Sequence, residues 1–313
     1  MLGTHMEAEI REQPEVLRRG VETYLPSLQG FVKGLSFDMV VLAARGSSDN
    51  AALYARYLFE VLLGVPVALA APSVLTRYGR RVRYPKCLTI GISQSGAAPD
   101  VAEVLTAIRE GGHATLAITN TPDSRITHAA DCTLLLQSGD EHSVAATKTY
   151  TASLLALHEL VRALGGALEA PPIPGDRWLD TAMAEAEAGV GPVLRSQILF
   201  ALARGYNFAT AQETALKLME CALLPCKSYS SADFEHGPRA LAGHGSAAIV
   251  YGETLPFLEE QGALVVKAPV GASGPAAPIW DIVFGQWLAL LTARARGLDP
   301  DDPQYIHKIT ETL

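Results

Sequence analysis

One stretch of predicted helix carries two carboxylates and an amine at regular spacing. Glu213, Lys217 and Glu220 stand at positions i, i+4 and i+7, which places them on one stripe of a helix. The residues around them are nearly all apolar, so the solvated face of this helix is narrow. A carboxylate in a mostly apolar setting tends to have a raised pKa and can exchange protons near neutral pH. The stripe therefore indicates proton transfer, although an ordinary exposed Glu–Lys pair fits the same spacing.

Two residues nearer the C-terminus are further candidates for chemistry. His236 lies in the segment 233–238, where a Gly-Pro pair forces a turn and keeps the histidine off a core face. Histidine is the side chain best suited to proton transfer at neutral pH, although a histidine in a loop can be incidental. Lys308 stands on the C-terminal tail, where a lysine is normally solvated.

Polar turns rich in hydroxyl groups follow two of the predicted strands. Residues 93–96 (Ser-Gln-Ser-Gly) come directly after the strand candidate 88–92, and residues 46–49 (Gly-Ser-Ser-Asp) follow the first strand. Hydroxyls and backbone N–H groups together suit the oxygens of a phosphate, and open α/β sheets bind ligands at the carboxyl ends of their strands. The two turns could meet in one phosphate pocket, or each could simply cap the helix that follows it.

A third polar segment, residues 141–148 (Glu-His-Ser-Val-Ala-Ala-Thr-Lys), opens a predicted helix over 146–164. Lys148 would lie in the first turn of that helix, where a cation opposes the helix dipole. This mild cost suggests a purpose for the lysine, while a solvated side chain fits the position as well.

The elements that position these residues repeat along the chain. Residues 37–68 and 196–227 look like two copies of one unit, in which an apolar run ends in Ala-Arg-Gly before a polar turn and a helix-like stretch. A buried strand that leads through a glycine turn into a helix N-terminus favours anions, because free N–H groups and the helix dipole both attract negative charge. The repeat predicts two related α/β domains and a phosphorylated ligand.

Short apolar runs alternate with helical stretches, which indicates parallel sheets covered on both faces. We expect an N-terminal helix over 7–30, and four domain segments: a first domain with its N-terminal helix (7–166), a linker with a bridging helix (167–194), a second domain (195–297) and a C-terminal tail (298–313). The further elements that we expect are strands at 67–70, 87–92, 114–119, 132–137, 198–203, 247–251 and 263–268, and helices at 98–110, 177–194 and 278–296.

Bulk composition narrows the class of protein. The net charge is −8 and no basic block stands out, so a nucleic-acid partner is not expected. No apolar run reaches the length of a membrane span, because the longest, 279–291, is interrupted by Asp281 and Gln286. Residues 1–6 lack the features of a signal peptide and are interpreted as a vector remnant with Met6 as the native start. The spacing of the four cysteines matches no zinc pattern, so we expect reduced core thiols in a cytoplasmic protein.

Taken together, these elements resemble the SIS (sugar isomerase) domain family in its tandem form. The resemblance covers nearly all of residues 7–313. It rests on five features that occur in the family's order and spacing: the turn at 93–96, the segment 143–148, the stripe at 213–220, the turn at 235–238 and the tail lysine. It implies two similar doubly wound, flavodoxin-like parallel-sheet domains with helices on both faces. It also implies a homodimer in which the site lies at the interface and the histidine comes from the partner subunit.

The resemblance also implies a role for each candidate residue. It assigns the sugar phosphate to Ser48, Ser93, Gln94 and Ser95, and the lining of the sugar site to Val144 and Ala146. It assigns proton transfer between C1 and C2 to Glu220, ring opening to His236, positioning to Glu213 and Lys217, and closure over the substrate with Schiff-base formation to Lys308. No cofactor and no metal is implied.

Two departures from the family pattern favour its deaminases. Ala97-Ala98 stand where a Glu-Thr pair is common, which removes one phosphate contact, and Ala146 replaces a common serine. No cysteine precedes Cys87, so we expect no glutamine-hydrolysing domain before Met6. The expected activity is conversion of glucosamine 6-phosphate to fructose 6-phosphate and ammonia. A fructosamine-6-phosphate deglycase and a non-catalytic sugar-phosphate sensor remain alternatives, and the sugar configuration stays open.

Overall fold

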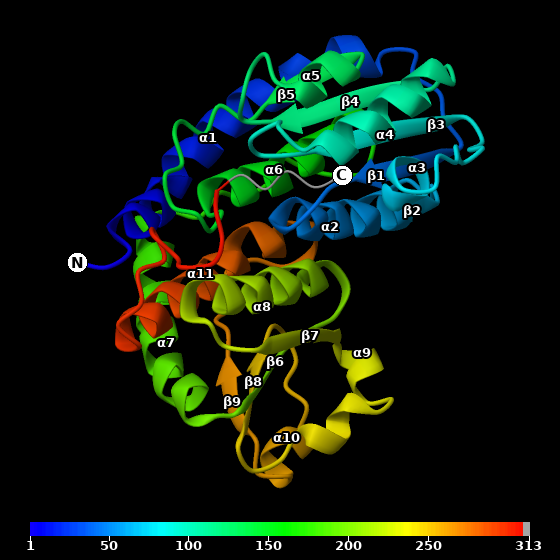
Figure 1. Ribbon diagram of the computed structural model, residues 1–313. Helices are drawn as coiled ribbons and strands as arrows, with labels where there is room; N and C mark the ends of the chain where they lie inside the picture. The colour runs from blue at the N-terminus through cyan, green and yellow to red at the C-terminus, as the bar shows by residue number, and fades with distance from the viewer. Residues whose placement is uncertain (309–313) are drawn as a thin grey trace. The chain divides into compact units, whose positions relative to one another are not determined.

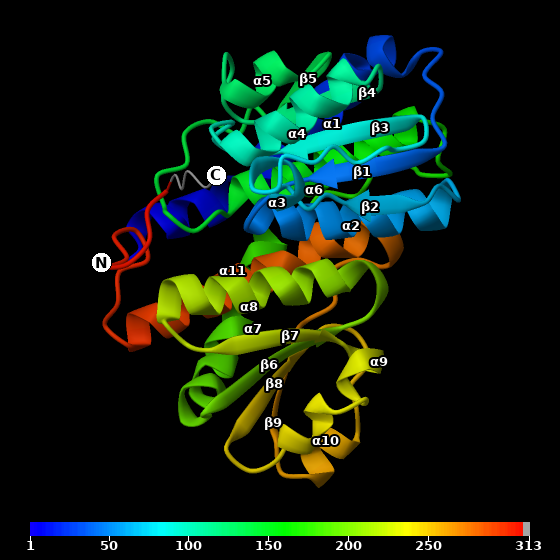
Figure 2. The same cartoon turned by 45° about the vertical axis from the view of Figure 1, so that its right-hand side comes forward.

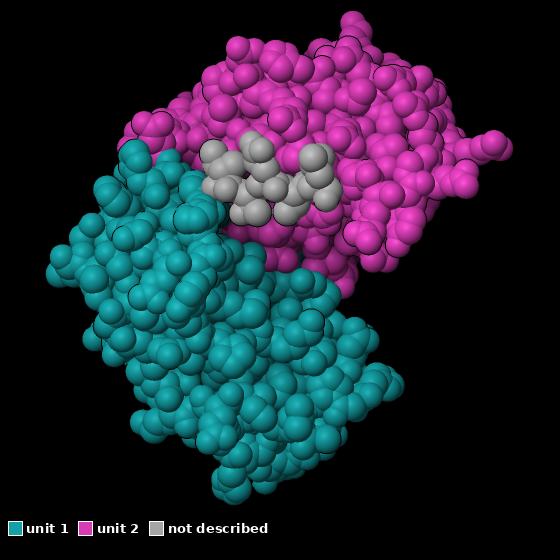
Figure 3. All heavy atoms as spheres, in the orientation of Figure 1, with its two compact units in different colours: residues 1–14, 141–148, 172–308 teal, residues 15–140, 149–171, 309–313 magenta. Residues whose placement is uncertain are grey.

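The computed structural model describes residues 1–308 of the chain (Figures 1 and 2). These residues form two compact units, shown in different colours in Figure 3. Unit 1 holds residues 1–14, 141–148 and 172–308, and unit 2 holds residues 15–140 and 149–171. The units cut across the domain bounds expected from the sequence, because the start of the chain and the segment 141–148 pack with the second half.

Unit 2 is built on a five-stranded sheet in the order β2-β1-β3-β4-β5, and all of its strand pairs are parallel. The middle strand is buried over its whole length, as expected for a parallel sheet covered on both faces. The strands are β1 (Met39–Ala43), β2 (Val67–Leu69), β3 (Cys87–Ile92), β4 (Ala114–Thr119) and β5 (Cys132–Leu135). The expected strand 132–137 ends early, since Gln137 has a left-handed φ of 51°.

Helices cover both faces of this sheet. α4 and α5 pack on one face, where Val41, Ala43 and Ala117 of the strands meet Leu105 and Ile126 of the helices (Figure 1). On the other face, the part of α1 in unit 2 lies so close to α6 that a Cβ on Gly20 would be 2.7 Å from Leu155. The helices are α1 (Thr4–Val32, shared with unit 1), α2 (Ser47–Leu62), α3 (Ser73–Thr76), α4 (Pro99–Glu110), α5 (Arg125–Ala129) and α6 (Lys148–Ala163, whose first residue belongs to unit 1).

Unit 1 contains a four-stranded parallel sheet in the order β7-β6-β8-β9. Alternate residues of β6 point to opposite faces: Leu199 and Ala201 join the core under α7, α8 and α11, whereas Phe200 and Leu202 join the core with α9 and α10. The strands are β6 (Ile198–Ala203), β7 (Cys226–Ser230), β8 (Ser246–Val250) and β9 (Leu264–Lys267). The α-helices are α7 (Asp176–Arg195), α8 (Phe208–Ala222), α9 (Ser231–Phe234), α10 (Phe257–Glu260) and α11 (Ala277–Ala295).

The repeat found in the sequence is present in the topology. β2-β1-β3-β4 and β7-β6-β8-β9 have the same order, with the first strand of each unit between its second and third. The two doubly wound sheets confirm the expected fold class. Strand β7 was not expected, because it is an edge strand in which only Cys226 is buried, so it lacks an apolar pattern.

The start of α1 is capped by carboxylates from the C-terminal segment. The helix begins at Thr4, so it includes residues interpreted from the sequence as a vector remnant. The N–H of Gly3 donates to Asp299 (2.8 Å), and those of His5 and Met6 donate to Asp301 (2.8 and 2.9 Å). These acceptors satisfy N–H groups that have no partner within the helix, and negative charge is favourable there.

Helix α11 explains the most apolar stretch of the chain. By length and composition, residues Gly274–Ala295 could cross a membrane, yet 89% of their most apolar window is buried within the structure. Trp287, Phe284 and Leu288 are fully buried in the core of unit 1. The stretch is therefore the central core helix of this unit.

Candidate active site

The stripe predicted on one helix is present on α8. Lys217 Nζ lies 3.3 Å from Glu213 Oε1 and also forms an ion pair with Glu220 Oε2. The side chains of Glu213 and Lys217 are 0% and 1% exposed, whereas that of Glu220 is 25% exposed. The stripe is therefore not the ordinary exposed Glu–Lys pair that the sequence left open as an alternative. Of the three groups, Glu220 is the one that solvent or a ligand reaches.

The electrostatics of the stripe keep Lys217 charged. Burial alone would lower the pKa of Lys217, but the adjacent carboxylates of Glu213 and Glu220 raise it, and the net shift is upward. Burying ions costs several kcal/mol each in desolvation, so such a cluster is weak as a stabilising device. Buried, strongly coupled charges beside a reachable carboxylate are typical of functional sites.

The tail lysine is bound rather than solvated. Lys308 Nζ donates to Glu141 Oε2 (2.8 Å) and to the carbonyl oxygen of Ser143 (2.7 Å). The Glu141 side chain is fully buried, and its other oxygen accepts the N–H of Thr147 (2.9 Å). The lysine expected to close over the substrate is thus attached to the segment that carries Val144 and Ala146.

Sequence reasoning missed a buried carboxylate in this region. The carboxylate of Glu9, on α1, accepts the N–H groups of His142 and of Ser143 (3.3 Å), and the residue is 3% exposed. Burial, together with the negative charge of Glu141, raises the pKa of Glu9 to about 7. A glutamate on the apolar face of the expected N-terminal helix was the signal that could have identified it.

Lys148, at the start of α6, has a structural partner. Its side chain is 3% exposed and its Nζ lies 2.5 Å from Glu12 Oε2. The ion pair offsets the unfavourable position of a cation at a helix N-terminus. A solvated lysine, the alternative left open by the sequence, is therefore wrong.

The hydroxyl turns lie at one edge of the sheet in unit 2. β1 and β3 are neighbours, with Ala43 opposite Gly91, so Ser48 and the turn 93–96 follow adjacent strand ends. Arg45 Nε donates to Asp100 Oδ2 at 2.7 Å, which ties the end of β1 to the start of α4. The two turns thus occupy the position where open α/β sheets bind ligands.

These hydroxyls do not cap the helices that follow. The N-cap of α4 is Ala98 and that of α2 is Gly46, and neither helix has a side-chain cap hydrogen bond. Within the turn, Gly96 has a φ of 66° and its N–H donates to the Ser93 carbonyl (3.1 Å). The N–H of Ala97 donates to Ser95 Oγ at 3.3 Å. Simple helix capping, the alternative for this turn, is not what the structure shows.

His236 lies in an irregular segment, as expected. It follows α9, it is exposed, and its N–H donates to the Asp233 carbonyl (3.0 Å). Gly237, next in sequence, has a φ of 149°. Within the part of the chain that the structure describes, the His236 ring forms no hydrogen bond or ion pair with the α8 stripe. Its role in catalysis stays a prediction.

The cysteines behave as core thiols. All four are free, and Cys87, Cys221 and Cys226 are buried. Burial raises the pKa of Cys221 and of Cys226 to about 12, so both thiols are protonated at neutral pH. Among residues 1–308, no three His, Cys, Asp or Glu side chains group closely enough to hold a metal ion.

Parts of the chain are similar in sequence to known proteins. Residues 38–163 match the SIS domain. The chain is 32% identical to the glutamine–fructose-6-phosphate aminotransferase (isomerizing) of Pseudomonas syringae pv. tomato, over 96% of this chain and 57% of that protein. The chain thus spans little more than half the length of this relative.

Two solved structures have the same fold. The glucosamine-6-phosphate deaminase of Thermotoga maritima superposes with a TM-score of 0.83 at 24% identity, covering 99% of this chain and all of that chain. The C-terminal domain of glucosamine–fructose-6-phosphate aminotransferase from Francisella tularensis gives a TM-score of 0.78 at 22% identity, covering 94% and 97%.

Proposed function

Because the chain belongs to the SIS-domain family, we propose that it is a sugar-phosphate isomerase acting on aminosugar phosphates, and specifically a glucosamine-6-phosphate deaminase. The reaction consumes water and yields fructose 6-phosphate and ammonia. One observation carries the proposal: a buried Glu213–Lys217 pair presents Glu220 as a carboxylate that a ligand can reach.

Each step of the proposed reaction uses a group already described. Ser48, Ser93, Gln94 and Ser95 bind the phosphate through hydroxyl, amide and backbone donors. His236 opens the sugar ring, and Glu220 then takes the proton from C2 and returns it at C1. This transfer converts the C2 amine into an imine, which water hydrolyses to the ketone and ammonia.

Lys217 and Glu213 have positioning roles in this scheme. The charged Lys217 fixes the carboxylate of Glu220 and stabilises negative charge that develops on the open-chain oxygens. Glu213, fully buried, holds the Lys217 ammonium in place. Lys308 supplies an amine that can react with the ketose carbonyl once it leaves Glu141.

We further propose that the active unit is a homodimer in the cytoplasm. Free cysteines are typical of proteins kept in a reducing compartment. An exposed His236 without a catalytic partner in its own α8 stripe is consistent with a histidine that acts in the site of the partner subunit.

A panel assay tests the function. Purified protein in EDTA is given glucosamine 6-phosphate, galactosamine 6-phosphate or a fructosamine 6-phosphate, and ammonia and ketose phosphate are measured separately. Equal amounts of ammonia and fructose 6-phosphate from the first substrate support the deaminase. Release of a free amino acid or amine from the fructosamine would identify the deglycase. Activity that vanishes with EDTA and returns with a divalent ion, or no turnover of any substrate, contradicts the proposal.

A further inference from the structure

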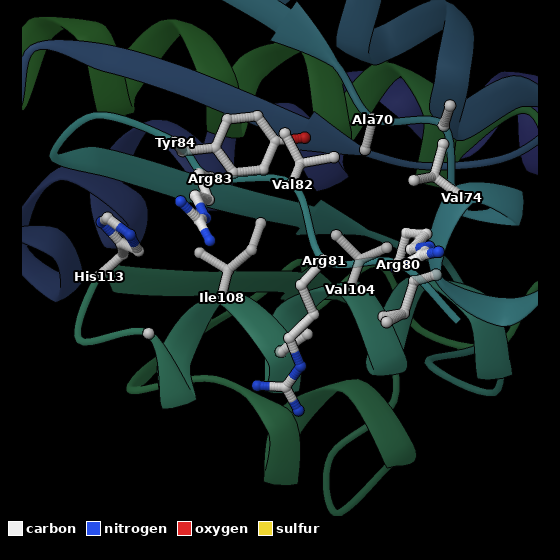
Figure 4. A pocket seen from close by; sticks show the side chains of 14 residues that line it. Ala70, Val74, Arg80, Arg81, Val82, Arg83, Tyr84, Val104, Ile108 and His113 are labelled. Carbon is white, nitrogen blue, oxygen red and sulfur yellow. The ribbon is translucent and has the colours of Figure 1, made fainter. Parts of the chain in front are cut away.

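Unit 2 has a hollow that contains none of the proposed substrate-binding residues. It has a volume of about 290 Å³ and lies between α3, the segment 80–84 and the C-terminal half of α4 (Figure 4). Its walls include the apolar side chains of Val74, Val82, Val104 and Ile108. A ligand with an apolar body could therefore be enclosed there.

The charge of this pocket is opposite to that of the whole protein. The segment 77–86 carries Arg77, Arg80, Arg81, Arg83 and Lys86 and no carboxylate, in a chain whose net charge is −8. Three of these arginines line the pocket, and no aspartate or glutamate does. The expectation that no basic block stands out is therefore wrong for this segment.

Two of the lining arginines are available to a ligand. Arg81 pairs with Glu110 at 2.6 Å. Within residues 1–308, by contrast, no carboxylate lies within ion-pair distance of the Arg80 or Arg83 guanidinium groups. Figure 4 shows Arg83 on the same side of the pocket as His113 and Tyr84, with Arg80 at the opposite end. Unpaired guanidinium groups at two ends of an apolar hollow favour an anion.

Two further side chains of the pocket, those of His113 and Tyr84, can donate hydrogen bonds. The backbone N–H of Cys87 donates to His113 Nδ1 at 3.3 Å, so the proton of the neutral ring is on Nε2. The ring is held against Gly111, where an added Cβ would lie 3.2 Å from His113 Cδ2. Burial, with a smaller contribution from Cys87, raises the pKa of Tyr84, so its hydroxyl keeps its proton. Guanidinium, imidazole N–H and phenol O–H together match the oxygens of an anion.

We propose that this pocket binds a small organic anion, in which an apolar or aromatic body carries a phosphate or carboxylate group. Arginine forks bind both oxyanions in bidentate fashion, and the valine and isoleucine side chains enclose the body. A neighbouring hollow between α4 and α5 lacks this character, because Glu103 and Glu110 also line it.

Calorimetric titration with phenyl phosphate tests the proposal, and benzoate tests the same site with a carboxylate in place of the phosphate. Inorganic phosphate probes the anionic group alone, and benzyl alcohol probes the apolar body alone. Phenyl phosphate or benzoate should bind with one-to-one stoichiometry in this pocket, at least tenfold more tightly than either half. Binding should persist in Ser93→Ala/Ser95→Ala, which removes hydroxyls from the other anion-binding turn. No binding at millimolar probe, or binding lost only in that variant, would overturn the assignment.

Matched variants locate the site. Arg80→Ala/Arg83→Ala should weaken binding at least tenfold, the usual effect of losing a hydrogen bond to a charged group, because the double variant removes the guanidinium at whichever end the anion binds. Arg77→Ala removes an exposed arginine of the same segment that does not line the pocket, and should change little. Val82→Glu places a carboxylate in the lining at a position 50% exposed, and should abolish binding, whereas Val82→Thr should retain it. Suppose that Arg77→Ala and the double variant lose affinity for the probe equally, with unchanged melting temperatures. The anion would then be attracted non-specifically by the charge of the segment, and a specific binding site would be refuted.

Discussion

Lys308 donates to Glu141 Oε2 at 2.8 Å, so a lysine near the C-terminus is attached to a carboxylate that is fully buried. The same amine also donates to the Ser143 carbonyl. A tail lysine that serves only solubility would not be held by two acceptors. The contact gives Lys308 a defined docked position, from which the amine could be released toward a substrate.

Lys308→Arg should lose most turnover while it keeps phosphate-driven binding. A guanidinium can pair with Glu141, but it cannot form a Schiff base at neutral pH. Lys267→Arg, at an exposed position on β9, is the matched control and should keep full activity. Turnover and fructose 6-phosphate affinity are measured for both variants. Equal turnover in the two would remove the catalytic role of Lys308.

Glu141→Gln should loosen the tail. Neutralising this carboxylate removes the charge-assisted partner of Lys308, and such bonds contribute more than neutral ones. Limited proteolysis should then cut the C-terminal tail several times faster than in the parent protein, and added fructose 6-phosphate should slow the cut in the parent. Cleavage rates that respond to neither change would show that the docked position is unimportant.

The stability of the protein should depend on pH through Glu9. Its pKa is raised from the ordinary 4.5 to about 7, so the folded state holds this proton more tightly than the unfolded state. The resulting stabilisation is full below pH 4.5 and is lost as the pH rises to about 7. The shift corresponds to roughly 3 kcal/mol at most.

Glu9→Gln isolates this contribution. The amide oxygen can still accept the N–H groups of His142 and Ser143, but the titrating group is gone. Burial also raises the pKa of Asp281, to about 6. Its contribution to the pH dependence is the same in the parent and the variant, so it cancels when the two are compared. Urea unfolding between pH 4 and 8 should show a smaller fall in the free energy of unfolding for the variant. Parallel curves would mean that the Glu9 carboxyl does not titrate in this range.

Glu213→Gln should lower the free energy of unfolding. Its side chain is fully buried beside Lys217, and breaking a buried ion pair costs about 3–5 kcal/mol. Glu187→Gln, on the exposed face of α7, should stay within about 0.5 kcal/mol of the parent. Urea unfolding measures both free energies. A Glu213→Gln protein as stable as the parent would show that the pair is not a structural requirement.

Mixing experiments should reveal whether His236 acts across a dimer interface. His236→Ala and Glu220→Gln are each expected to be inactive alone. If the histidine serves the partner's site, mixed dimers contain one intact site and recover part of the activity after subunit exchange. Mixtures that exchange subunits, verified by mass spectrometry of tagged chains, and yet stay inactive would place the histidine in its own chain's site.

The spacing of apolar and polar residues predicted most helices and strands and the α8 stripe. Contacts between residues far apart in the sequence could not be predicted. The helical period alone places Glu213, Lys217 and Glu220 together. The Glu9–Ser143 and Lys148–Glu12 contacts join positions more than a hundred residues apart, and a single sequence carries no signal for such pairs. Strand β7 was missed because edge strands need little apolar surface.

The most direct test of the account is the turnover of glucosamine 6-phosphate by Glu220→Gln, measured as ammonia and fructose 6-phosphate. Because Glu220 is 25% exposed and the buried Lys217 keeps Glu213 as a partner, the substitution should leave the fold and ligand binding intact. Turnover should fall by roughly 10²–10⁴, the usual contribution of a positioned general base. Glu187→Gln should retain the activity of the parent. Near-parental turnover in Glu220→Gln would contradict the assignment of this carboxylate as the base that moves the proton.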